Sequence, residues 1–105
     1  MVRINNPIIR TFTKMIHSEI RPCRIFLFGS RAKGTARKNS DYDFLLISPK
    51  FRRQEWEKRT ARIYQLKKNI PAAMDIICLT PKEFEKKSKE LSIVQEAVRE
   101  GVELA

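Results

Sequence analysis

Two short apolar runs, separated by a polar loop, limit the folds open to this chain. The first run, Cys23–Phe28, ends at Gly29-Ser30, and the second follows directly on Asp41-Tyr42-Asp43. Short runs rich in aliphatic and aromatic residues are typical of buried strands. A strand that ends in Gly-Ser beside a strand that opens with two acids places a phosphate cradle against paired carboxylates. The pattern therefore predicts a sheet with a functional site at the ends of two neighbouring strands.

The same reasoning extends to the rest of the sheet. We expect strands at about residues 24–29, 43–47 and 73–79, with a short edge strand at 102–104. The first two strands must be antiparallel if Gly-Ser and Asp-x-Asp serve one site. The second and third are joined by a long helical segment, which fits a parallel pair. These elements predict an α+β fold with a small mixed sheet and helices packed on it.

Apolar residues at helical spacing and cap residues predict the helices. Asn6-Pro7 is typical of a helix start, and Thr80-Pro81 repeats this pattern with Glu83 in a capping-box position. Trp56 shares helical spacing with buried-type residues and is expected in the core. We expect helices at about residues 6–20 and 52–68, one from Thr80, a last one through Leu91, Val94 and Val98 to Gly101, and a short helix or turn at 30–36.

Composition indicates a soluble globular protein that meets an acidic partner. Hydrophobic residues make up 42% of the 105-residue chain, charged residues 32%, and the net charge is +10. Such charge suits a nucleotide, RNA or an acidic protein surface. We find no membrane span or signal-peptide pattern and expect a cytoplasmic protein. Cys23 and Cys78 are interpreted as buried free thiols.

Three acidic residues are candidates for metal binding. Asp41 and Asp43 alternate along a strand, so both side chains point to one face about 6.5 Å apart, while Tyr42 points to the other face and packs. Paired carboxylates repel each other unless a divalent cation lies between them, and oxygen ligands suit Mg²⁺ or Mn²⁺. Asp75 interrupts the third strand and is expected to be the third ligand. The alternatives are a turn role for Asp41 and a solvent-facing edge charge for Asp75.

The segment after the first strand is a candidate phosphate site. Gly29 permits close approach of the backbone, and Ser30 begins a helix whose amides and hydroxyl suit phosphate oxygens. Arg31 and Lys33 add positive charge there. Three carboxylates can hold two metal ions that assist an in-line displacement at phosphorus.

The pattern Gly-Ser, ten residues, Asp-x-Asp resembles the signature of the DNA polymerase β-like nucleotidyltransferases, in their minimal (MNT) branch. The resemblance covers essentially the whole chain, including Asp75, and implies a single nucleotidyltransferase domain over residues 1–105. It implies catalytic and metal-binding roles for Asp41, Asp43 and Asp75 and nucleotide contacts at Gly29 and Ser30. It also implies an antitoxin that transfers AMP from ATP, with Mg²⁺, to a tyrosine hydroxyl of a HEPN-type toxin.

Two other functions stay open at this point. One is a non-catalytic antitoxin that docks on its partner. The other is an enzyme that transfers a nucleotide to an RNA end. Residues 50–68 carry eight basic side chains against two glutamates, which is either a solvated helix face or a docking surface for a toxin or RNA. The intact set of three acids favours catalysis over docking alone.

Overall fold

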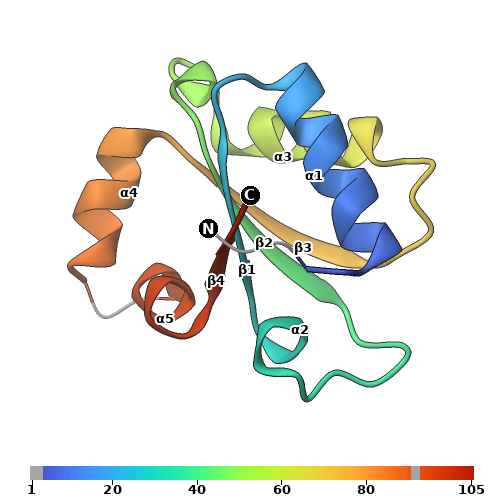
Figure 1. Cartoon of the computed structure of the whole chain (residues 1–105). Coiled ribbons are helices and arrows are strands. Elements are labelled where there is room, and N and C mark those ends of the chain that lie inside the picture. The colour runs from blue at the N-terminus through green and yellow to red at the C-terminus, as the bar shows by residue number, and fades with distance from the viewer. Residues whose placement is uncertain (1–3, 91–92) are drawn as a thin grey trace.

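A computed structural model describes residues 4–90 and 93–105 of the chain. A sheet of four strands in the order β3-β2-β1-β4 forms the middle of the molecule. Helices α1 (Pro7–Glu19) and α3 (Trp56–Leu66) lie on one side of the sheet in Figure 1, and α4 (Pro81–Ser88) and α5 (Ile93–Glu100) lie on the other. The expected α+β fold with a mixed sheet is confirmed.

The first two strands are antiparallel, as predicted. β1 (Arg24–Phe28) pairs with β2 (Tyr42–Ile47) so that Phe28 lies opposite Asp43. This register places Gly29, the next residue of the chain, beside the start of β2. The two halves of the sequence motif therefore meet at one end of the sheet.

The outer strands complete the sheet. β3 (Met74–Leu79) runs parallel to β2, after the crossover through α3. β4 (Val102–Leu104) pairs antiparallel with β1, and the short strand predicted there is confirmed. β3 and β4 are thus the two edge strands of the sheet.

Alternation along β2 divides the core between the two faces of the sheet. Phe44 and Leu46 pack with α1 and α3, whereas Leu45 and Ile47 belong to the second cluster with Val94 and Ala97 of α5. Tyr42 is buried in the first cluster, as predicted. Because alternate side chains of a strand share a face, Asp43 points to the α5 side.

Helix α1 begins where the sequence predicts. Asn6 caps it, since its Oδ1 accepts hydrogen bonds from the amides of Ile8 and Ile9 at 2.8 and 3.1 Å, and Pro7 is the first helical residue. Phe12 of this helix stacks on Phe44 with ring centroids 4.3 Å apart. This stack fixes α1 on the strand that carries Asp43.

The prediction for α3 was partly wrong. The helix starts at Trp56 rather than near residue 52, because a 3-10 helix, η1 (Pro49–Phe51), precedes it. Trp56 is 45% exposed rather than in the core. Arg59, which the sequence places on the basic outer face, is instead buried. The buried stripe of α3 is therefore rotated relative to the predicted one.

Arg59 is buried because its guanidinium donates hydrogen bonds to two backbone carbonyls and to Glu83. Its Nη1 donates to the carbonyl oxygen of Cys78 at 3.3 Å and forms an ion pair with Glu83 at 2.6 Å. Its Nε donates to the carbonyl oxygen of Gln54 at 3.0 Å. A buried guanidinium is tolerated when its donors are used in this way. One side chain thereby links α3, β3 and α4.

The edge of β3 is covered by side chains of α3. The Tyr64 hydroxyl donates to the Met74 carbonyl oxygen at 2.7 Å, and the Lys67 ammonium donates to that of Ala72 at 2.6 Å. Together with Arg59 at Cys78, these bonds use carbonyls of the edge strand β3 and of Ala72, which precedes it, that would otherwise be open. We call this arrangement the β3 edge cover.

Helix α4 begins and helix α5 ends where the sequence predicts. Thr80 and Glu83 form the predicted capping box at the start of α4, with bonds of 3.2 and 2.8 Å. α5 ends at Glu100, directly before Gly101, as predicted. Val94 is buried but Val98 is 38% exposed, and the predicted contribution of Leu91 falls outside the described residues. No helix within residues 4–90 and 93–105 has the length and apolar character to cross a membrane.

Candidate active site

Two carboxylates lie side by side at the ends of β2 and β3. Asp43 and Asp75 are direct partners in the parallel register. Burial raises the pKa of Asp43, and the charges of Asp75 and Asp41 and a hydrogen bond to Asp75 raise it further. Like charges held this close lower the stability of the sheet unless a proton or cation compensates them. The fold thus brings together the acids that the sequence singles out, while their function stays a prediction.

Asp41 flanks this pair. It is exposed, directly before β2, and its charge acts on Asp43. Within the described part of the chain, no group of three acidic, histidine or cysteine side chains converges closely enough to hold a metal ion. Asp43 and Asp75 therefore form the centre of the site, and Asp41 lies at its rim.

Gly29 forms the wall opposite Asp43. Its φ of 71° is a backbone conformation that residues other than glycine rarely adopt. A Cβ atom at this position would lie less than 3.0 Å from Asp43 Oδ2. The backbone of Gly29 can approach the carboxylate for this reason alone.

The loop between the two motif halves is held by Arg31, which lies in the short helix α2 (Ser30–Lys33). Its guanidinium lies over the Tyr42 ring, 4.2 Å from the centroid, and Nη2 donates to the Ser40 carbonyl oxygen at 2.8 Å. A second bond, at 3.3 Å, reaches the Lys38 carbonyl oxygen. Arg31 thus braces the loop that leads to Asp41, and the positive charge that the sequence predicts it adds at the phosphate site stays a prediction.

Lys33 lies across a small hollow from α5. Its ammonium forms an ion pair with Glu100 at 3.0 Å, and this contact raises the pKa of Lys33 and lowers that of Glu100. The hollow has a volume of about 230 Å³. It is lined by Phe28, Gly29, Lys33, Asp43, Glu96, Ala97 and Glu100. Gly29 and Lys33 of the candidate phosphate site and Asp43 of the candidate metal ligands therefore border one cavity.

Comparison with known families agrees with this geometry. The family model described as the nucleotidyltransferase domain matches residues 9–102. The chain belongs to this family. The matched segment includes every residue of the candidate site, from Gly29 to Asp75. No curated protein matches the sequence of this nucleotidyltransferase domain with significance.

Solved structures similar to this nucleotidyltransferase domain show the same fold. A protein assigned as a nucleotidyltransferase from Sulfolobus solfataricus has a TM-score of 0.65 and 20% identity, over 91% of this chain and 75% of that one. A toxin–antitoxin structure with AMP-PNP has a TM-score of 0.67 and 22% identity, over 97% and 73%. A MntA–HpeT toxin–antitoxin variant with two aspartates changed to glutamates has a TM-score of 0.65 and 20% identity, over 91% and 71%.

Tyr64 is a residue of the site that the sequence reasoning missed. Its hydroxyl is bonded to Met74, the residue before Asp75. Burial raises the pKa of Tyr64, and the charges of Asp75 and Asp41 add to that shift. The hydroxyl therefore stays a neutral donor beside the acids. No local pattern signals this, because it depends on how α3 is placed along β3.

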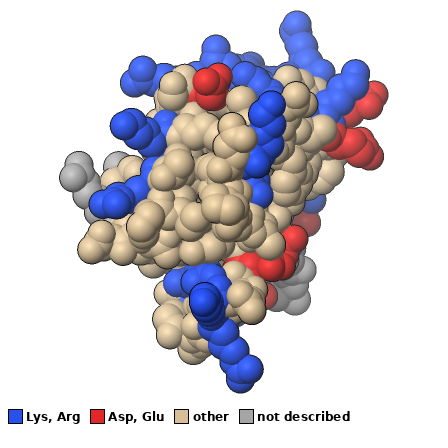
Figure 2. Space-filling view, turned by 90° about the vertical axis from the view of Figure 1, so that its right-hand side faces the viewer, with Lys and Arg blue, Asp and Glu red and all other residues tan. Residues whose placement is uncertain are grey.

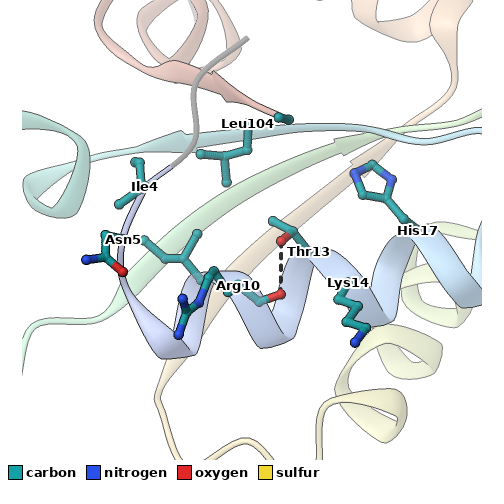
Figure 3. Close-up of a pocket in the computed structure, with 9 residues that line it drawn as sticks. Ile4, Asn5, Arg10, Thr13, Lys14, His17 and Leu104 are labelled. Carbon is teal, nitrogen blue, oxygen red and sulfur yellow. Dashed lines mark hydrogen bonds between the residues drawn. The ribbon is translucent and has the colours of Figure 1, made fainter.

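A larger hollow of the nucleotidyltransferase domain lies away from the motif, between α1 and β4. Figure 3 shows it bordered by α1 residues such as Arg10 and Lys14 and by Leu104 of β4. Its volume is about 640 Å³. None of the candidate metal or phosphate ligands lines it, whereas Gly29, Lys33 and Asp43 line the smaller cavity.

Proposed function

We propose that this protein is a Mg²⁺-dependent nucleotidyltransferase that transfers AMP from ATP to a hydroxyl, a tyrosine side chain, on a HEPN-type toxin, for which it is the antitoxin. The observation that supports this best is the meeting of Gly29, Asp43 and Asp75 at one end of the sheet. Membership of the nucleotidyltransferase domain family supports the reaction class.

The donor set fits magnesium. Asp43 and Asp75 offer only carboxylate oxygens. Burial and then the neighbouring charge of Asp75 raise the pKa of Asp43, and a bound cation would offset the cost of ionising it. Asp41 at the rim would add a third carboxylate. When bound, Mg²⁺ would neutralise the triphosphate and favour ionisation of the attacking hydroxyl. Manganese has the same preference for oxygen ligands.

Residues of the chain itself bind the nucleotide and accept the proton of the acceptor hydroxyl. Gly29 lets the backbone approach the triphosphate closely, and Ser30 offers a hydroxyl at the start of α2. The acceptor oxygen forms a bond to the α-phosphorus, and the bond to the departing pyrophosphate breaks. Asp75 takes the acceptor proton in this proposal, which is supported by its being the more exposed of the central pair.

A separate protein is the proposed acceptor. The described residues form one set of layers around the sheet, and Asp75 is exposed at its edge. The similar toxin–antitoxin structure with AMP-PNP supports the pairing of such a domain with a toxin and a nucleotide. The HEPN class and the tyrosine come from the resemblance of the motif.

Incubation with ATP labelled at the α-phosphate, Mg²⁺ and the candidate toxin tests this function. We expect label on the toxin, and its loss in the Asp41→Asn and Asp43→Asn variants. Unlabelled toxin that these variants still neutralise would show an antitoxin that acts by docking. Label on added RNA in place of protein would show transfer to an RNA end.

A further inference from the structure

Helix α3 exposes two large aromatic side chains, and one of them, Tyr64, lies at the edge of β3. Trp56 is 45% exposed and Tyr64 is 39% exposed. They lie two turns apart on one flank of the helix, with Thr60 between them. Exposed Trp and Tyr are the residues that most often anchor protein interfaces. The flank ends at Tyr64, whose hydroxyl touches the strand that carries Asp75.

Exposed cations come before and after this aromatic flank in the chain. Of the basic residues in 50–68, Arg59 is buried and Lys67 is bonded to the β3 edge. The others are exposed, and two exposed glutamates, Glu55 and Glu57, oppose them. Helical spacing turns Lys58 and Arg62 to the opposite flank of α3, where Arg62 donates to the Glu19 carbonyl oxygen at 3.4 Å. The exposed cations that come before and after the helix are Lys50, Arg52, Arg53 and Lys68. Figure 2, which views the side with α1 and α3, shows basic side chains gathered over the upper part of this face.

We propose that Trp56, Tyr64 and these exposed cations form a docking surface, the α3 surface, for an acidic face of the acceptor protein. The inference rests on the proposed function, because it requires an acceptor that is a protein. Tyr64 lies at the end of this surface nearest Asp75, so a protein seated there presents its hydroxyl to the acid that takes the proton. Charge complementarity supplies the attraction and the aromatic residues supply the buried contact.

The arrangement favours a protein over RNA. Trp56 and Tyr64 are eight positions apart in the helix, which corresponds to about 12 Å along its axis. Consecutive bases of a nucleic-acid strand are only about 3.4 Å apart. The guanidinium of Arg59 lies 5.8 Å from the Trp56 ring centroid. Trp56 is thus held in place from below, as a fixed anchor for a protein surface.

The experiment compares α3 variants with matched variants on the opposite side of the sheet. Trp56→Ala removes the anchor, and Arg52→Glu with Lys68→Glu reverses two exposed charges. Val98→Ala and Lys82→Glu with Lys86→Glu make the same changes at exposed positions of α5 and α4. The assay measures transfer of labelled AMP to the candidate toxin over a range of toxin and ATP concentrations.

We expect each α3 variant to raise the KM for the toxin at least tenfold, at unchanged KM for ATP, and both control variants to behave as wild type. The charge-reversal variant should also lose most of the salt dependence of the reaction. Unchanged KM for the toxin in both α3 variants would overturn the proposal. Loss of polyadenylate binding in these variants, with toxin binding intact, would also overturn it and assign the surface to RNA.

Failure of the proposed function is distinguishable from failure of this inference. If the wild-type protein transfers no label, direct binding of the toxin to the same variants, measured by calorimetry, still tests the α3 surface. Weaker binding of both α3 variants relative to both controls would then support the surface without the enzymatic reaction. Equal binding by all variants would reject it.

Discussion

At the scale of single residues, the site depends on a glycine, Gly29, which has no Cβ atom. The backbone of Gly29 lies against Asp43 because hydrogen is the only substituent that fits there. Gly34, at the end of α2, has a similar φ of 76° but has open space where its Cβ would be. Substitutions at the two glycines therefore separate the effect of backbone conformation from the effect of a contact with Asp43.

We expect Gly29→Ala to lower the free energy of unfolding by about 2–3 kcal/mol and to weaken ATP binding, because the new methyl group displaces Asp43. Gly34→Ala should cost about 1 kcal/mol, since only the backbone conformation is strained. Urea denaturation and ATP titration measure both. Equal losses in the two variants would show that the contact with Asp43 has no role.

Asp43 carries a cost in stability that its replacement should relieve. Its pKa is raised, so its ionised form destabilises the folded state at neutral pH, and this penalty disappears as the pH falls and Asp43 is protonated. We expect Asp43→Asn to raise the Tm at pH 7–8, to raise it less near pH 4, and to reduce transfer at least a hundredfold. Thermal denaturation at both pH values, with an activity assay, tests this. A lower Tm at pH 8 would contradict the interpretation.

At the scale of secondary structure elements, the start of α1, the capping box of α4 and all four strands could be predicted from the sequence. Each depends on residues that are close together in the chain, such as Asn6 with Pro7 or Thr80 with Glu83. The rotation of α3 could not, because Arg59 is buried by partners on β3 and α4. Periodicity favours Trp56 for the core, but it contains no information on which distant carbonyl needs a donor.

Arg59→Met should be strongly destabilising, by about 2–3 kcal/mol, because it removes the guanidinium donor from the Cys78 carbonyl and from Glu83. Although burial alone would raise the pKa of Glu83, hydrogen bonds from Arg59 and Thr80 outweigh it and lower that pKa. The stabilisation by Glu83 is therefore present above its ordinary pKa of 4.5 and is lost as the pH falls below that value. Arg59→Met should flatten the dependence of Tm on pH in this range. Lys58→Met, at the exposed neighbour, is the control.

Tyr64→Phe tests the β3 edge cover at the end nearest the site. The variant keeps the ring but leaves the Met74 carbonyl without the hydroxyl donor, so the strand next to Asp75 is less firmly held. We expect a loss of about 1 kcal/mol in stability and a higher Mg²⁺ concentration for half-maximal transfer. Denaturation and a Mg²⁺ titration measure these effects. Unchanged Mg²⁺ dependence would limit Tyr64 to a structural role.

At the scale of the whole molecule, the candidate site is formed where separate parts of the chain converge. The sequence predicted the strand directions, and from them the neighbourhood of Asp43 and Asp75. It could not predict that Lys33 is bound to Glu100 of α5 or that Arg31 braces the loop, because these contacts depend on side-chain geometry between elements.

Binding of the proposed ligands should stabilise the whole fold. With Mg²⁺ and ATP at about 100 times their dissociation constant, mass action predicts a gain of about 2.7 kcal/mol, which is a rise in Tm of about 10 °C or more for a chain of this size. Thermal denaturation with Mg²⁺ and ATP, separately and together, measures this. Asp43→Asn should show little of the combined effect. A wild-type Tm that does not respond would contradict nucleotide binding at this site.

The β3 edge cover also determines how a partner can recognise this protein. An open strand edge presents only backbone groups, which pair with almost any extended segment and therefore discriminate poorly among sequences. Here α3 occupies the β3 edge with Tyr64, Lys67 and Arg59. A protein that approaches Asp75 from that side meets side chains rather than backbone. Selectivity for the proposed acceptor would thus depend on side chains at this edge rather than on the backbone of the sheet.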